Sequence, residues 1–415
     1  MSESRGEWNS HFEYFLTSLG IAVGLGNVWR FPYVCYDNGG GTFLIPYGIC
    51  LLLCGLPLYF MEMVLGQYGG SSCTKVFPKL APVMKGLGYA VLAVPTMMIF
   101  YYTLIMAWSF YYMFHGFRSE LPWQSCNSQE LANVSTMFCY SKHDNDLCLQ
   151  NFSNQSTFFG NTCMEKEEFC KVNGYSGYDV NEDSCVTAAN NLTSIPSVAR
   201  RVTPSEEFFN RRMYGQVEIG VVDTWESWGE PLWEMIGCLA LSWMIIALSL
   251  VKGVQSYGKL SYFITLFPYL IMTTFLITMG LQPGFSRGIT EFYMKADWER
   301  LTHAHVWVAA CTQIFYSLGV GVGCQLLLCS YNPVKSNIKI EYSQFSGSHY
   351  DLIIIYFQFN NNCHRDAWLI AVGNSLTSVY AGFVVFGTLG VLAEVSGCNS
   401  FAKFQHITLL THDSS

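Results

Sequence analysis

Hydrophobic residues along the chain gather into long runs, with polar stretches between them. A helix needs about 20 mainly apolar residues to cross the hydrocarbon core of a bilayer. Seven runs are long enough, and they predict membrane-spanning helices near residues 12–36, 42–65, 87–116, 233–251, 260–280, 305–330 and 367–394. The pattern therefore predicts an all-α polytopic membrane protein with about seven transmembrane helices.

The first and sixth of these spans contain residues that weaken a helix in lipid. Residues 20–33 hold three glycines, an Asn, an Arg and a Pro, and residues 309–323 place glycines and hydroxyls in mid-membrane. Unwound backbone exposes carbonyl groups that need partners in the bilayer, and a hard cation is bound by such oxygens. If spans one to five form one structural repeat, span six begins the next, so the two interrupted helices occupy matching places in the two repeats. Such a pair indicates an inverted-repeat transporter. The alternative is that the small residues only serve helix kinking and packing.

Charge supports the membrane assignment and orients the chain. Only 13% of its residues are charged and 51% are hydrophobic, whereas a soluble domain has about 25% charged residues. Basic residues near span ends stay cytoplasmic. Such residues follow spans two, four and six, namely Lys75, Lys79, Lys85, Lys252, Lys259, Lys335 and Arg365. We therefore expect a cytoplasmic N-terminus. The start from Met1 to Glu13 is polar, and the first apolar stretch is too long and too Gly-rich for a signal peptide, so we expect no cleavable one. The net charge of −8 with no basic stripe does not favour a nucleic-acid partner.

Residues 117–232 form a long polar stretch between spans three and four. Six cysteines lie in it: Cys126, Cys139, Cys148, Cys163, Cys170 and Cys185. Four glycosylation sequons begin at Asn133, Asn151, Asn154 and Asn191. Clustered cysteines and sequons are typical of an oxidising compartment. This stretch is therefore predicted to be an extracellular, disulfide-bonded and glycosylated loop.

Residues 1–395 are expected to form a single transmembrane domain, with two atypical segments. Residues 338–361 include an apolar run that is too short to span a bilayer. This segment is either an added cytoplasmic strand or interfacial segment, or a retained intron or gene-model error, and we favour the second interpretation. The tail at 396–415 has no apolar period, and we expect that it too is an artefact.

Several motifs resemble the neurotransmitter:sodium symporter family. Gly24–Tyr33 (GLGNVWRFPY), Asn38–Tyr47 (NGGGTFLIPY) and Gly55–Gln67 (GLPLYFMEMVLGQ) look like its first two helices. Gln313–Gly319 (QIFYSLG) and Asn374–Ser378 (NSLTS) look like its sixth and seventh. The resemblance covers most of 8–337 and 362–395 and is nearest to metazoan nutrient or neutral amino-acid transporters. It implies the first half of an inverted-repeat transporter fold, ending after the seventh helix.

The resemblance implies two sodium sites and one chloride site. The first sodium site is formed by a backbone carbonyl and three side-chain oxygens, at Ala22, Asn27, Ser317 and Asn374. The second uses the carbonyl groups of Gly20 and Val23, together with groups of an eighth helix that is missing here. The chloride site matches Tyr47, Gln313, Ser317 and Ser378. Chloride-independent bacterial relatives place an acid near Ser378, and a Ser there leaves the sodium-rich site short of negative charge, which an anion would supply.

The resemblance also implies an amino-acid substrate. Amine transporters of the family carry an Asp at the position of Gly24, and a Gly leaves room for a carboxylate that can itself ligate sodium. Such a shared bond couples the binding of ion and substrate. The substrate positions are Gly24, Gly26, Met98, Tyr102, Tyr316, Val320 and Gly321. None is charged, which favours neutral substrates.

Three further expectations concern a gate residue, the loop cysteines and an acid within the membrane, and the first two follow from the same resemblance. Arg30 matches an external gate residue whose acidic partner lies on a tenth helix. Cys126 and Cys139 match a disulfide of the outer loop, and the other four loop cysteines allow three connectivities. Glu62 is an acid within the membrane, and we expect it to brace unwound backbone rather than to bind an ion.

Together these features favour sodium-coupled, chloride-dependent symport of neutral amino acids across the plasma membrane. One alternative is a truncated, non-transporting chain that modulates a full-length partner. A seven-helix receptor would usually have its N-terminus outside, against the charge bias. An enzyme is least favoured, because no metal spacing or nucleophile constellation is visible.

Overall fold

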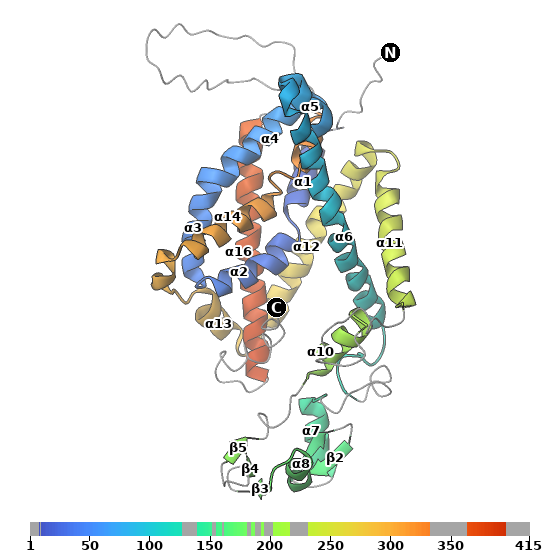
Figure 1. Cartoon of the computed structure of the whole chain (residues 1–415), viewed down its shortest axis with the longest axis vertical. Coiled ribbons are helices and arrows are strands. Elements are labelled where there is room, and N and C mark those ends of the chain that lie inside the picture. The colour runs from blue at the N-terminus through green and yellow to red at the C-terminus, as the bar shows by residue number, and fades with distance from the viewer. Residues whose placement is uncertain are drawn as a thin grey trace. The chain divides into compact units, whose positions relative to one another are not determined.

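The computed structural model describes residues 8, 10–126, 139–151, 155–159, 162–180, 184–186, 192–194, 202–215, 231–332 and 363–395. The two atypical segments, 338–361 and 396–415, lie outside the described residues, as do the sequons at Asn133, Asn154 and Asn191. The chain divides into two compact units. One comprises residues 1–99 and 247–415, and the other comprises residues 100–246 (Figure 1).

The regular secondary structure described in the first unit is helical. Its first part runs through α1 (His11–Ala22), η1 (Gly26–Arg30), α2 (Phe31–Asp37), η2 (Gly41–Phe43), α3 (Leu44–Cys50), η3 (Leu51–Gly55), α4 (Leu56–Gly69), α5 (Cys73–Leu80), η4 (Pro82–Met84) and the first half of α6 (Lys85–Gly116). Its second part runs through α12 (Val254–Gly280), α13 (Phe285–Gly288), η7 (Ile289–Tyr293), η8 (Trp298–Thr302), α14 (Ala304–Leu318), α15 (Cys324–Cys329) and α16 (Cys363–Val395).

The second unit contains the end of α6, most of α11 (Trp233–Leu250) and the polar stretch between them. Its other helices are α7 (Lys142–Asn151), α8 (Lys166–Val172), α10 (Pro204–Phe208) and η5 (Phe209–Met213). Two small antiparallel sheets accompany them, one of β1 (Ser156–Phe159) and β2 (Thr162–Glu165), the other of β3 (Gly177–Asp179), β4 (Ser184–Val186) and β5 (Leu192–Ser194).

The all-α class is confirmed, and so are five of the seven predicted spans. Within the described residues, five continuous helical stretches are long and apolar enough to cross a membrane: Gly41–Gly69, Pro82–Gly116, Trp233–Leu250, Ser256–Gly280 and Cys363–Glu394. They correspond to the second, third, fourth, fifth and seventh predicted spans. The first and sixth predicted spans are not among them because each is divided into two shorter helices.

Both divided spans break where their glycines predict. Helix α1 ends at Ala22, Val23 is extended (φ −86°, ψ 101°), and the chain resumes as the π-helical turn η1. Between α14 and α15, Gly319, Gly321 and Gly323 have φ values of +65°, +83° and +77°. A side chain at such positive φ is strained, whereas glycine adopts it freely. The glycines therefore allow the sixth span to unwind within the membrane.

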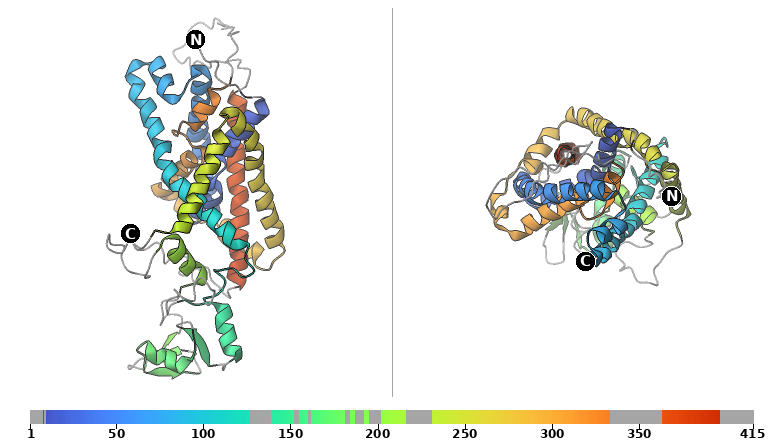
Figure 2. Two further views of the ribbon diagram at one scale, coloured as in Figure 1. Left: turned by 90° about the vertical axis from the view of Figure 1, so that its right-hand side faces the viewer. Right: turned by 90° about the horizontal axis from the view of Figure 1, so that it is seen from above.

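The core of the first unit forms around the broken helices. Its largest fully buried side chains include Tyr14, Phe31, Tyr59, Ile314 and Phe386, which come from α1, α2, α4, α14 and α16. Helix α16 contacts η1, α4, α12 and α14, and it lies beside α12 (Figure 2). This packing brings the breaks of the first and sixth spans to the seventh span.

Three disulfides hold the polar stretch of the second unit. Cys126 pairs with Cys139, as the family resemblance implied, and the other four cysteines pair as Cys148–Cys163 and Cys170–Cys185. The structure thus selects one of the three open connectivities. The predicted glycan acceptor that is described, Asn151, is exposed at the end of α7.

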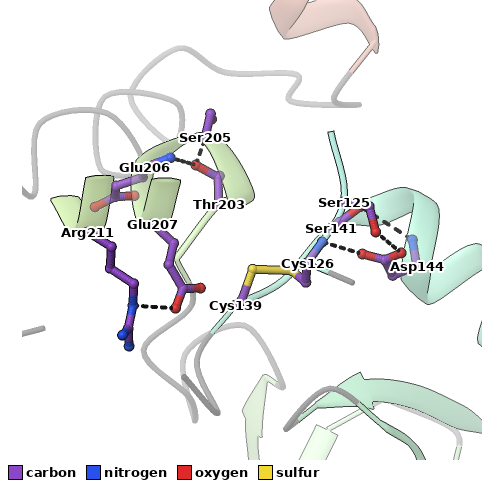
Figure 3. The surroundings of a disulfide bond; sticks show 10 residues. All are labelled: Ser125, Cys126, Cys139, Ser141, Asp144, Thr203, Ser205, Glu206, Glu207 and Arg211. Atoms are coloured by element: carbon purple, nitrogen blue, oxygen red, sulfur yellow. Dashed lines mark hydrogen bonds and ion pairs between the residues drawn. A yellow bond between two sulfur atoms is a disulfide. The ribbon is translucent and has the colours of Figure 1, made fainter. Parts of the chain in front are cut away.

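Polar contacts support the first of these disulfides (Figure 3). The carboxylate of Asp144 accepts a hydrogen bond from Ser125 Oγ (2.8 Å) and another from the backbone N–H of Cys126 (3.1 Å). On α10, Glu207 is fully buried and forms an ion pair with Arg211, with 3.1 Å between Oε1 and Nε. A buried carboxylate needs such compensation, so these contacts fix the local fold around the disulfide.

Candidate ion and substrate site

Asn27 lies at the break of the first span and joins the first span to the seventh. Its side chain is fully buried in η1. Its Nδ2 lies 2.8 Å from Asn374 Oδ1, 3.0 Å from the Asn374 carbonyl oxygen and 2.8 Å from Ser378 Oγ. Its Oδ1 accepts a hydrogen bond from the backbone N–H of Gly24 at 3.0 Å. The amide therefore links the extended segment of the first span to α16.

The sixth span joins the same network through Ser317 near the end of α14. Asn374 Nδ2 donates to Ser317 Oγ at 2.9 Å, and Ser317 Oγ lies 3.3 Å from Asn374 Oδ1. Ser317 is 3% exposed and Asn374 is fully buried. Three side chains expected at the first sodium site thus meet from three different spans, far from water.

The chemistry of this cluster fits a hard cation. The described residues contain no group of three His, Cys, Asp or Glu side chains that could hold a metal ion. The cluster instead offers amide and hydroxyl oxygens, the ligand class of hard cations. Gly20 and Ala22 lie in the last turn of α1, and Val23 follows it. Because a helix end leaves its last carbonyl groups without intrahelical partners, these three positions are suited to supply further oxygens.

The residues expected at the chloride site lie in the same buried region. Gln313 Nε2 donates to the carbonyl oxygen of Gly26 at 2.8 Å, and Tyr47 Oη donates to Ser375 Oγ at 3.5 Å. Ser378 already contacts Asn27. The Oε1 of Gln313 is buried without a hydrogen-bond partner among the described residues. The hydroxyl groups and the Nε2 of Gln313 can donate hydrogen bonds to an anion next to the Asn27 cluster, whereas the Gln313 Oε1 is an acceptor.

Ser375 is a residue that the sequence reasoning did not single out. It lies within the NSLTS motif, directly after Asn374, but no role was attached to it. Only the contact with Tyr47 reveals that it faces the chloride-site residues. The sequence feature that could have pointed to Ser375 is its hydroxyl group, which lies between two positions with assigned roles, Asn374 and Ser378.

Of the expected substrate residues, Gly26 and Tyr316 come together from the two broken spans. At Gly26 a Cβ atom would lie 3.1 Å from the ring of Tyr316, so glycine permits a close approach there. Val320 and Gly321 belong to the unwound segment after α14. Met98 is half-buried on α6 in the first unit, and its role stays a prediction. Tyr102 belongs to the second unit, so its role stays a prediction too.

Arg30 lies over the aromatic ring of Tyr316, one of the expected substrate residues. Its guanidinium carbon is 4.7 Å from the centroid of the Tyr316 ring, within the range of a cation–π interaction. Its Nη1 is buried without a hydrogen-bond partner among the described residues. A cavity of about 270 Å³ adjoins it, lined by Arg30, Val34, Asp37, Asn38, His305, Val308, Ala309 and Thr312. Arg30 therefore lies between this cavity and Tyr316.

Glu62 braces unwound backbone, as the sequence predicted. Its Oε1 accepts a hydrogen bond of 2.5 Å from the backbone N–H of Gly321, in the break between α14 and α15. An N–H freed by unwinding needs an acceptor in the membrane. Glu62 supplies it from α4 and thereby ties the second span to the break of the sixth.

A polytopic helical protein whose first and sixth spans break beside one buried cluster of oxygens has the architecture of a secondary transporter. The chain belongs to the sodium:neurotransmitter symporter family, whose model matches residues 5–176, 169–346 and 352–403. It is therefore a multi-pass membrane protein of a transporter family and not an enzyme.

Two relatives illustrate the similarity. The chain is 35% identical over 393 residues to the sodium- and chloride-dependent glycine transporter 1 of Xenopus laevis, covering 95% of this chain and 52% of the relative. It is 36% identical over 401 residues to the sodium- and chloride-dependent neutral and basic amino acid transporter B(0+) of Homo sapiens, covering 95% and 54%. The chain thus spans about half the length of the curated relatives it matches.

Proposed function

We propose that this chain takes part in sodium-coupled, chloride-dependent symport of neutral amino acids across the plasma membrane. The observation that carries the proposal is the meeting of Asn27, Ser317 and Asn374 between three spans, beside two breaks in the helices. Neutral oxygens that converge beside unwound backbone are suited to a small cation. Two relatives are named for sodium and chloride dependence and for amino-acid transport.

The substrate class follows from the first break. Gly24 presents no side chain, and its N–H points to Asn27 Oδ1. A substrate carboxylate next to Gly24 would therefore lie beside the proposed sodium ligands, and opposite charges would favour their joint binding. None of the proposed substrate positions carries a charge, which favours neutral side chains on the substrate.

The positive charge of bound sodium would favour a chloride ion close to the proposed sodium ligands. The side chains proposed for sodium are all neutral, so one or two cations would leave a buried excess of positive charge. Burying such a charge without compensation is costly. Tyr47 and Gln313 offer hydrogen-bond donors beside the Asn27 cluster, and an anion bound there would offset the charge.

We place the N-terminus in the cytoplasm and the polar stretch of the second unit outside the cell. Basic residues such as Lys75 and Lys252 lie in the connections assigned to the inside. Disulfides persist in oxidising compartments, and the polar stretch contains three. Its exposed Asn151 is available to a glycan. The disulfides and the glycan acceptor are both typical of an extracellular face.

The test is uptake of radiolabelled glycine and leucine by cells that express the chain, in sodium medium and in medium with choline instead. Uptake should require sodium, and Asn27→Ala should abolish it. Asn332→Ala is the matched control. It removes another buried Asn, whose side-chain atoms have no hydrogen-bond partner among the described residues. Uptake that does not depend on sodium would refute the proposed coupling of amino-acid transport to sodium.

A second measurement does not need transport. The purified chain in detergent should become more resistant to heat as sodium replaces choline, because a ligand that binds only the folded state stabilises it, by about 2.7 kcal/mol at 100 times its Kd. The Asn27→Ala protein should not respond. If the chain shows no uptake but lowers the uptake of a co-expressed full-length family member, the alternative of a modulating chain is favoured instead.

A further inference from the structure

Two cysteines outside the ion site bring their thiols together between the second and sixth spans. The Cys311 sulfur lies 2.9 Å from the Cys50 sulfur. Cys50 is the buried last residue of α3, and Cys311 is half-buried in α14. A disulfide bond is about 2.05 Å long. The two sulfurs therefore need to approach by less than about 1 Å to form one.

Helix packing, rather than flexible side chains, holds this pair in place. Cys50 Sγ also lies 4.0 Å from the carbonyl oxygen of Trp307, one turn before Cys311 on α14. On the other side of the pair, a Cβ atom at Gly55 would collide with the side chain of the fully buried Ile314. The second span thus touches α14 on both sides of the two thiols, and their proximity is built into the packing.

We propose that Cys50 and Cys311 are a reversible redox pair, in which oxidation by a peroxide links the second span to the outer half of the broken sixth span. Hydrogen peroxide first oxidises the more accessible Cys311 thiol to a sulfenic acid and releases one water. The Cys50 sulfur then attacks the sulfenic sulfur. The S–O bond breaks, the S–S bond forms and the hydroxyl leaves with the Cys50 proton as a second water. A dithiol reductant restores both thiols.

The bond has a consequence for the site on α14. Gln313 and Ser317 follow Cys311 on the same helix and contact the first and seventh spans. Linking α14 to α3 removes freedom of movement of these side chains relative to the second span. Oxidation therefore slows sodium-dependent uptake. This consequence rests on the proposed symport function, whereas formation of the bond does not.

Bond formation is tested on membranes that contain the protein. They are treated with hydrogen peroxide, free thiols are blocked with N-ethylmaleimide, and the digested protein is examined by mass spectrometry for a peptide joining Cys50 to Cys311. We expect this peptide in the oxidised sample and its loss on reduction with dithiothreitol. Cys50→Ser and Cys311→Ser should each abolish it, and Cys54→Ser, which removes the neighbouring thiol, should leave it unchanged. A peroxide-treated protein without this peptide, or one joining Cys54 to Cys311, would overturn the proposal.

Transport is measured on the same preparations. Peroxide should lower sodium-dependent uptake by the wild-type and Cys54→Ser proteins, and dithiothreitol should restore it. Uptake by Cys311→Ser should resist the same treatment. An equal loss in Cys311→Ser would refute the link between this bond and transport. If the untreated wild-type protein shows no sodium-dependent uptake, the proposed symport fails, while the linked peptide still decides the redox pair.

Discussion

Replacing Glu62 by Ala should weaken sodium binding although Glu62 is not a proposed sodium ligand. Its carboxylate accepts the hydrogen bond of the Gly321 N–H in the break of the sixth span. Without this acceptor, the N–H of the unwound turn has no partner from α4. The unwound conformation, which places Ser317 at the end of α14 beside Asn374, then becomes less favourable.

The size of the effect follows from this one hydrogen bond. Leaving a buried donor unsatisfied costs about 1–3 kcal/mol. Glu62 is 8% exposed, but Gly321 is at an exposed position of the chain, so the lower part of the range, about 1–2 kcal/mol, applies. Since 1.4 kcal/mol corresponds to a tenfold change in an equilibrium constant, the population of the competent conformation falls at most roughly 5- to 30-fold.

The assay is a sodium titration of amino-acid uptake or of thermal stability. For Glu62→Ala, the half-saturating sodium concentration should rise by up to this factor. Glu62→Gln is the matched control because its Oε1 can still accept the hydrogen bond, and its titration should stay near that of the wild type. Identical curves for Glu62→Ala and the wild type would refute the bracing role. An equal rise in the half-saturating sodium concentration for both variants would assign the effect to the lost charge of Glu62 instead.

The remaining predictions concern packing, substrate class and modification. Gly66→Ala should lower the melting temperature in detergent, because its Cβ would collide with the Leu326 carbonyl oxygen and overpacking typically costs about 1–3 kcal/mol; Gly48→Ala, with no atom within 4 Å of its Cβ, should not. Gly24→Asp should block amino-acid uptake by repelling the substrate carboxylate, and retained leucine uptake would count against the substrate class. Asn151→Gln should increase electrophoretic mobility relative to the wild type, a difference that should vanish after enzymatic deglycosylation.

The spans and their breaks could be predicted from the sequence because both depend on local composition. A run of about 20 apolar residues is long enough to cross a bilayer wherever it occurs. Glycine at 319, 321 and 323 allows positive φ without help from a neighbouring element. The first span breaks next to Gly24 and Gly26, but neither of these glycines has a positive φ, and the extended residue is Val23. Five of the seven predicted spans are accordingly long apolar helices among the described residues, and the other two are interrupted where the sequence predicted.

The sequence predicted which residues belong to the site but not the contacts between them. The motifs supplied Asn27, Ser317 and Asn374 through a family resemblance, but residue types alone did not place them within hydrogen-bond distance. The same holds for Gln313, which donates to the Gly26 carbonyl. Such contacts depend on how each helix is rotated about its axis, which apolar periodicity in a membrane span hardly specifies, since lipid and protein faces are both apolar.

The sequence by itself thus determined the membrane class, the places where two spans unwind and the chemistry offered there. Only the tertiary structure decided the pairing of four loop cysteines, the contact of Ser375 with Tyr47 and the meeting of Cys50 with Cys311. Asn27 and Asn374, which touch, are 347 residues apart in the chain. Local composition sets where a backbone can bend, whereas contacts over such separations arise only when all the intervening helices have packed.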